Sequence, residues 1–197
     1  MNKLLLLVSI SILFSCGTQE VTEYWNNGEL KLIGKQKDGK QIGKWIQFDA
    51  KGDTTQIQYY ENGEMIMMDQ YGRTNENLPM TLLIRSKYRN SKLHGEDLMF
   101  YPNGQIYRKG QFEKGVRIDT FFYYNPNGSV EQFSVFDNDR ITVQHQYWPN
   151  GNIMLKINNY LTGKHYLYDS LGLTEYVVNV DSSEAGISMD TLEINTR

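Results

Sequence analysis

The chain has 197 residues, with 20 Lys and Arg against 23 Asp and Glu, which gives a formal net charge of -3 at pH 7. This near-balance argues against a nucleic-acid-binding protein, since such proteins usually carry a basic surplus. Aromatic residues make up 13% of the chain, which has 14 Tyr and 17 Gly but only two alanines, Ala50 and Ala185. That composition favours strands over helices, and the single cysteine excludes a disulfide framework.

The first 15 residues have the pattern of a signal peptide. Lys3 precedes an apolar run from Leu4 to Phe14, which is too short to cross a hydrocarbon core of about 30 Å as a helix. The run leads into Leu13-Phe14-Ser15-Cys16-Gly17, which resembles the lipobox of bacterial lipoproteins. The resemblance implies cleavage before Cys16 and acylation of that cysteine with fatty acids such as palmitate. The alternative is an ordinary secretory signal that has a cysteine there by chance.

Acylation of Cys16 would attach the protein to a membrane, because several acyl chains together hold far more firmly than one. Residues 16–22 would then form a short lipidated tether, and the rest of the chain would face water. The residue after the cysteine is Gly17, which is compatible with sorting to the outer membrane. We therefore expect a monomeric lipoprotein of the bacterial cell envelope, on the periplasmic or the outer side.

Residues 23–180 contain a repeat with a period near 24 residues, which predicts stacked supersecondary units. The repeat is marked by a turn glycine with an aromatic residue four positions before it. These glycines are Gly28, Gly52, Gly104, Gly128, Gly151 and Gly172. Asn-Gly pairs and alternating apolar residues between the turns are typical of a β-hairpin. A second set of turns, such as Asp38-Gly39, falls half a period later and predicts the opposite edge of a sheet.

Nine residues before the turn glycine stands a further glycine, as at Gly43, Gly95 and Gly163, where we expect a bulge. The whole pattern, clearest from His94 to Gly104, resembles the variant MORN repeat of bacterial YwqK-family proteins. Together these features predict an all-β fold: an elongated up-and-down antiparallel meander of about 15 strands between Val21 and Ile194. The strands would form a single sheet, twisted or curled.

The repeat signature lapses between Met65 and Asn90. We expect a longer loop at Gly72–Asn77, sensitive to proteases, followed by a strand from Met80 to Tyr88. Residues 181–197 form a polar C-terminal segment with room for one capping strand.

The search for chemistry leads to no catalytic site, metal site or cofactor. His94, His145 and His165 lie at least 20 residues apart, so no local zinc spacing exists. His145 and His165 align with apolar and aromatic residues of the other repeats, and His94 adjoins the repeat glycine Gly95, so a structural or surface role explains them better than zinc. Asp137-Asn138-Asp139 could suggest calcium, but the later Gly and Glu of a calcium loop are missing, and a turn is the better interpretation.

Four aromatic residues stand beside the repeat aromatics, and strand alternation would turn them to the other face of the sheet. This candidate binding face consists of Trp25, Tyr60, Tyr101 and Trp148. Such a row could bind a glycan or a protein by stacking, or it could simply stabilise the sheet. We expect a non-enzymatic binding or scaffold module for a protein or glycan partner. The alternatives are an immunity-like protein that neutralises a toxin, which the YwqK resemblance implies, and, less favoured, an enzyme.

Overall fold

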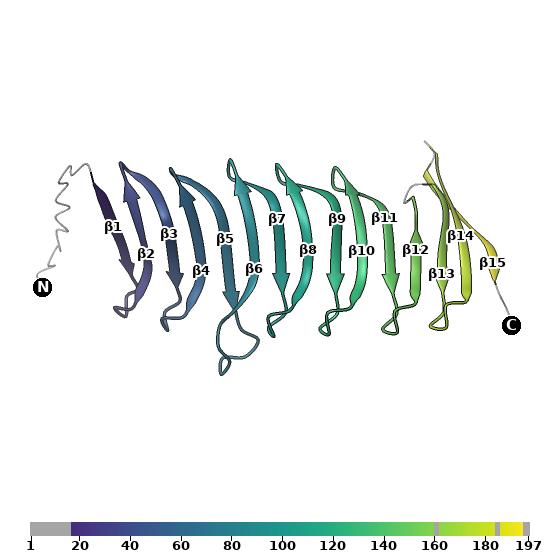
Figure 1. The fold of residues 1–197 in the computed structure, drawn as a ribbon, viewed down its shortest axis with the longest axis horizontal. Coiled ribbons are helices and arrows are strands. Elements are labelled where there is room, and N and C mark those ends of the chain that lie inside the picture. Colours follow the sequence, from purple (N-terminus) through teal and green to yellow (C-terminus); the bar gives the residue numbers. More distant parts are fainter. Residues whose placement is uncertain (1–16, 160–161, 184–185, 195–197) are drawn as a thin grey trace, which may run out of the picture.

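The computed structural model describes residues 17–159, 162–183 and 186–194. Within these ranges the chain forms one 15-stranded sheet in which every strand pairs antiparallel with the next (Figure 1). The strands are β1 (Thr18–Tyr24), β2 (Leu30–Lys37), β3 (Lys40–Phe48), β4 (Thr54–Glu61), β5 (Glu64–Gly72), β6 (Thr81–Arg89), β7 (Lys92–Phe100), β8 (Ile106–Glu113), β9 (Val116–Tyr124), β10 (Val130–Asp137), β11 (Arg140–Tyr147), β12 (Ile153–Ile157), β13 (Gly163–Tyr168), β14 (Thr174–Ser183) and β15 (Gly186–Ile194). The predicted meander is confirmed.

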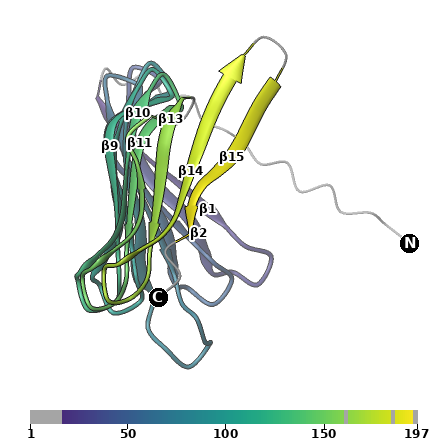
Figure 2. The same ribbon diagram turned by 90° about the vertical axis from the view of Figure 1, so that its right-hand side faces the viewer.

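The sheet is open, with β1 and β15 at its two ends. At about 4.8 Å per strand, its fourteen spacings give a ribbon roughly 67 Å long. Figure 2 shows that the strands at the two ends are inclined in opposite senses, as the twist of a single sheet requires. The ribbon is therefore one layer thick and exposes both faces.

The two edges of the ribbon use different turns. The lower edge in Figure 1 carries the turns after odd-numbered strands, and the upper edge carries those after even-numbered strands. At the lower edge, the Asn27 carboxamide accepts the Glu29 N–H at 3.1 Å, and Gly28 takes a positive φ of 87°. At the upper edge both central residues have positive φ, as at Asn62 (51°) and Gly63 (89°), which matches the twist of a two-residue hairpin. The prediction that a second set of turns, such as Asp38-Gly39, forms the opposite edge is confirmed.

The predicted bulges are present at Gly43 and at Gly95, which has φ of 96° and lies opposite a register shift between Ser86 and Tyr88. Gly43 has φ of 63°, and the pairing of β2 with β3 shifts between Ile33 and Lys35, on the opposite strand. Asp119 replaces glycine at the same repeat position and is held at φ of 61°. The bulge therefore belongs to the fold, even where glycine is lost.

The strand bounds test two boundaries that the sequence predicts, those of the loop after Gly72 and of the N-terminal tether. The expected loop is present, between Gly72 at the end of β5 and Thr81 at the start of β6. The expected tether at 16–22 needs correction, because β1 begins at Thr18, which pairs with Lys37 of β2. Residues 18–22 look like a linker in the sequence because an end strand has few apolar contacts, yet its backbone is fully paired on one side. At the other end, β15 covers residues 186–194 of the C-terminal segment.

A single layer buries little, so the core consists of separate small clusters. The buried apolar residues are Trp45, Phe121, Phe136, Ile157, Val177 and Val180. Phe121 is 0% exposed, and its ring packs edge-to-face against Phe112 and Phe136 at centroid distances of 5.5 and 5.0 Å. Between these clusters lie two ion pairs with buried carboxylates, Asp69 with Arg85 and Asp97 with Arg108.

Candidate functional site

The lower edge gathers three of the four predicted aromatic residues. Trp25, Tyr101 and Trp148 each follow the last residue of a strand, so they stand in turns and not on a sheet face. The alternation rule places a side chain only while the strand continues, and here the strand has ended. The prediction that these residues face away from the repeat aromatics on the sheet is therefore corrected to a position along one edge.

Each of the three side chains donates a hydrogen bond to the next lower-edge turn along the ribbon. The acceptor is always the backbone carbonyl of an aromatic residue, and this residue is the last one of the strand two further along the chain. The bonds run from Trp25 Nε1 to Phe48 O (3.1 Å), from Tyr101 Oη to Tyr124 O (2.7 Å) and from Trp148 Nε1 to Tyr168 O (3.0 Å). The ring of each residue is consequently fixed in orientation, and consecutive turns are tied together.

Tyr60 is not brought together with the other three. It lies in β4, next to the upper-edge turn at Asn62-Gly63, and its ring packs edge-to-face on Trp45 at 6.2 Å. Its hydroxyl donates to Gln58 Oε1 at 3.2 Å, and burial raises the pKa of Tyr60 above its ordinary value of 10.0. Tyr60 therefore packs within the sheet.

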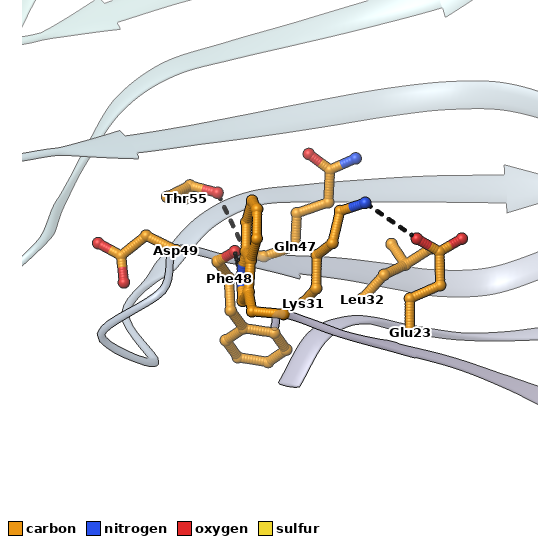
Figure 3. Close-up of a pocket in the computed structure, with 8 residues that line it drawn as sticks. Glu23, Lys31, Leu32, Gln47, Phe48, Asp49 and Thr55 are labelled. Atoms are coloured by element: carbon orange, nitrogen blue, oxygen red, sulfur yellow. Dashed lines mark hydrogen bonds and ion pairs between the residues drawn. The ribbon is translucent and has the colours of Figure 1, made fainter. Parts of the chain in front are cut away.

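A hollow of about 500 Å³ opens beside Trp25, and we call it the Trp25 hollow (Figure 3). It lies between the first two lower-edge turns. Its lining residues are Glu23, Trp25, Lys31, Leu32, Gln47, Phe48, Asp49 and Thr55. Indole and phenyl rings thus stand beside carboxylate, amide, ammonium and hydroxyl groups. That combination suits a ligand with one flat apolar side and several polar groups.

The charged groups of the Trp25 hollow are held in place. Lys31 Nζ lies 3.2 Å from Glu23 Oε2, as Figure 3 shows, and 5.4 Å from the centroid of the Trp25 ring. The Asp49 carboxylate accepts the backbone N–H groups of Asp53 at 3.0 Å and Lys51 at 2.9 Å. These hydrogen bonds hold the pKa of Asp49 below its ordinary value of 3.8. The carboxylate therefore stays ionised near neutral pH.

A second hollow of about 290 Å³ occupies the equivalent place four lower-edge turns along, between the β9–β10 and β11–β12 turns. It is lined by Asn125, Glu131, Gln132, Gln146, Tyr147, Trp148, Pro149 and Met154. Its Gln146, Tyr147 and Trp148 correspond to Gln47, Phe48 and Asp49 of the first hollow by their places at the end of a strand. The same place between two lower-edge turns is therefore hollowed in two repeats, and the sequence of each repeat decides its chemistry.

One face of the sheet carries a row of aromatic rings in contact, which the sequence did not single out. It runs across β9, β10 and β11, where Phe133 contacts Phe122 at 6.1 Å, His145 at 4.7 Å and Tyr147 at 6.5 Å between centroids. The row could have been found from the sequence only with the strand register, because its members lie on different strands. Aromatic contacts of this kind between strands stabilise a sheet, and they account for His145 without a metal.

The central strands contain buried ion pairs with structural roles. Asp69 is 0% exposed, and Arg85 Nε and Nη2 donate to its two oxygens at 2.7 Å each. The hydrogen bonds to Asp69 raise the pKa of Arg85 above its ordinary value. Asp97 is similarly held by Arg108 and by the Ser86 hydroxyl, which donates at 2.6 Å. These pairs neutralise charges that the sheet buries.

The structure also bears on the predictions about the Asp137-Asn138-Asp139 turn, metal sites and membrane-spanning segments. Asp137-Asn138-Asp139 forms an upper-edge turn, and the Asp139 carboxylate accepts from Arg117 Nε at 2.7 Å. Among the residues described, no group of three His, Cys, Asp or Glu side chains is placed to hold a metal ion. Over the same ranges, no helix has the length and apolar character needed to cross a membrane. Cys16 lies outside the described residues.

Comparison with known proteins identifies one segment. Residues 93–114, which run from β7 through β8 into the turn after it, match the MORN repeat variant. No curated protein matches the chain. A crystal structure of TcdB2-TccC3-TEV is 11% identical over 86% of this chain and 12% of that one, with a TM-score of 0.22. The Tc holotoxin pore of Photorhabdus luminescens is 13% identical over 88% and 12%, with a TM-score of 0.20. The chain thus spans about an eighth of those chains.

Proposed function

We propose that this protein is a non-enzymatic binding and scaffold module of the bacterial envelope, which holds a protein or glycan partner along its lower edge. The observation that carries the proposal is the Trp25 hollow. Its indole is fixed by the hydrogen bond to Phe48 and stands beside polar groups that are already oriented. A rigid aromatic ring loses little conformational entropy on binding, so it is an effective anchor for a partner.

The ionisation of the lower-edge carboxylates supports binding over catalysis. General acids and bases work best when their pKa lies near the operating pH. The Asp49 and Glu76 carboxyls instead have pKa values lowered from their ordinary ones, Asp49 by backbone hydrogen bonds and Glu76 by Lys51. Such groups act as fixed charges and hydrogen-bond acceptors, which is what recognition needs.

We further propose that Cys16 is the lipid attachment point, as its lipobox-like context implies. β1 begins at Thr18, two residues after Cys16, so an acylated Cys16 would hold the β1 end of the ribbon close to the membrane. In this arrangement the remaining strands extend away from the anchor as a binding surface. Replacing Cys16 with Ser should abolish partitioning of the full chain into the detergent phase, and unchanged partitioning would rule out this anchor.

Variants of Trp25 test the binding role. Envelope proteins and a glycan panel would be offered to the full chain in nonionic detergent, and each captured partner would be titrated against four forms: wild type, Trp25→Ala, Trp25→Phe and Tyr24→Ala. Tyr24 is the matched control, because it is 62% exposed, lies next to Trp25 in the chain and does not line the hollow. Loss of a true anchor costs about 2 kcal/mol or more, or roughly 30-fold in affinity.

Trp25→Ala should therefore weaken binding by about this factor, and Tyr24→Ala should stay close to wild type. Trp25→Phe should weaken binding less than Trp25→Ala, because it keeps an aromatic ring but loses the hydrogen bond to Phe48 O. Equal affinities for all four forms would refute a role for the Trp25 hollow. The identity of the captured partner would then distinguish a glycan or scaffold role from the immunity-like role that the YwqK resemblance implies, in which the partner is a toxin.

A further inference from the structure

The upper edge contains a hollow of about 310 Å³ lined mainly by cations, which we call the Lys92 hollow. It lies between the β6–β7 and β8–β9 turns and is lined by Arg89, Asn90, Lys92, His94, Glu113 and Lys114. Three side chains are permanently positive and one is a carboxylate. Within the described part of the chain, Arg89, Lys92 and Lys114 form no ion pair or side-chain hydrogen bond. Their donors are free to bind a ligand.

The repeat itself does not require this charge. Successive upper-edge turns are joined in the same way, by Gly63 N–H to Gln41 O at 3.0 Å, Gly115 N–H to Leu93 O at 2.8 Å and Asp139 N–H to Arg117 O at 3.2 Å. These bonds identify the two places equivalent to the Lys92 hollow. At the first, the charged residues are Lys37, Asp38, Lys40 and Glu61. At the second, they are Glu113, Lys114 and Asp137. Neither place has a positive surplus, so the repeat does not impose the surplus of the Lys92 hollow.

We propose that the Lys92 hollow binds a phosphate monoester group carried by a small polar molecule, such as a sugar phosphate. A phosphate monoester carries about −1.5 to −2 charges at pH 7 and three acceptor oxygens. The surplus of three cations over one carboxylate complements a dianion, and ammonium and guanidinium groups make charge-assisted hydrogen bonds to phosphate. The volume of the hollow lies in the range of small-molecule sites, about 300–1,000 Å³. His94, which is half-buried, adds a ring nitrogen to the same wall.

The neighbouring turns favour a discrete ligand over a flat anionic surface. On one side of the Lys92 hollow, the exposed residues Glu61 and Glu64 border the β4–β5 turn. On the other side, the exposed residue Asp137 borders the β10–β11 turn. A membrane or an extended polyanion lying along the upper edge would meet these carboxylates on both sides and be repelled by them. A ligand that fits between two turns avoids them. This inference does not depend on the lower edge, so either can fail without the other.

Titration of the full chain in nonionic detergent tests the proposal, with hexose 6-phosphate as the probe and the matching unphosphorylated hexose as its blank. Lys92→Ala with Lys114→Ala removes two cations from the hollow. The matched control, Lys35→Ala with Lys37→Ala, removes two exposed cations from the β2 end of the same edge. The hollow variant should bind the ester at least about tenfold more weakly, whereas the control should bind it as wild type does. Circular dichroism would verify that both variants keep the strand signal.

Two further arms identify the source of the phosphate. Inorganic phosphate should compete with the ester, whereas micelles doped with phosphatidate should bind no better than undoped micelles. Failure of the ester to bind, equal loss in the control variant, or binding to phosphatidate micelles alone would each overturn the proposal.

Discussion

The indole of Trp45 lies directly on Gly34 of the neighbouring strand, so close that a Cβ on that glycine would stand 2.2 Å from the ring. The ring is 6% exposed, and its Nε1 donates to Lys35 O at 3.1 Å. Phe121 covers Gly110 in the same way, with a hypothetical Cβ at 2.3 Å. A single-layer sheet has no second layer to bury an aromatic ring, and here a missing side chain on the next strand provides the space.

Gly110→Ala should therefore destabilise the protein by about 1–3 kcal/mol through overpacking against Phe121. Gly110 does not have a positive φ, so backbone strain adds nothing to the cost. Urea unfolding of the single variants Gly110→Ala and Phe121→Ala and of the double variant would measure the coupling. The double variant should lose less stability than the sum of the singles, because the clash needs both side chains. Strict additivity would show that the ring does not depend on this glycine.

The Gly34–Trp45 and Gly110–Phe121 contacts also mark how far sequence reasoning reached. The period of the turn glycines is a local signal, and it predicted the meander, the loop after Gly72 and the bulge at Gly43. Which strand residue faces which glycine depends on the register between strands, which the turns and bulges shift by whole residues. Trp25, Tyr101 and Trp148 were found as candidates, but their placement on a face was wrong because the strand ends one residue before each of them. The hollows could not be predicted, since they form between repeats.

The hydroxyl of Tyr101 should stabilise the fold by linking two turns. Its hydrogen bond to Tyr124 O is 2.7 Å long, and an average intramolecular hydrogen bond contributes about 1 kcal/mol. Tyr101→Phe should lower the free energy of unfolding by about that amount while keeping the ring. Tyr24→Phe is the matched control, because Tyr24 is 62% exposed and its hydroxyl has no hydrogen bond within the described residues. Equal effects in denaturant titrations of the two variants would disprove the link.

Acidification should weaken the protein partly through Asp139. Hydrogen bonds from the Arg117 side chain and backbone hold the pKa of Asp139 below its ordinary value of 3.8. A group whose pKa is lower in the folded state contributes stability above its unfolded pKa and loses it as the pH falls through the folded pKa. Thermal midpoints measured from pH 6 to pH 2 should therefore fall less steeply below about pH 3.8 in Asp139→Asn than in wild type. Parallel curves of thermal midpoint against pH for the two proteins would show that Asp139 does not contribute to the loss of stability in acid.

The loop from Arg73 to Met80 should be the first site of proteolysis. It is the longest turn of the lower edge (Figure 1), and two exposed side chains there suit limited digestion: Glu76 at 83% and Leu78 at 49% exposure. A protease specific for Glu should cut after Glu76 before any other site, as mass spectrometry of early fragments would show. First cuts within β8 to β12 would mean that the repeats there are less well formed than the structure shows.

The proposed binding role depends on an open single-layer ribbon, because a curled or closed sheet would not present a long lower edge to a partner. Spin labels at Lys51→Cys and Leu171→Cys, with Cys16→Ser in the full chain, would mark two exposed lower-edge turns. These turns are ten strand spacings apart, or about 48 Å at 4.8 Å per strand. Dipolar spectroscopy should give a distance near 48 Å, or slightly more with the label linkers. A distribution centred below about 30 Å would show a curled or closed sheet, since ten spacings of an open sheet cannot be that short.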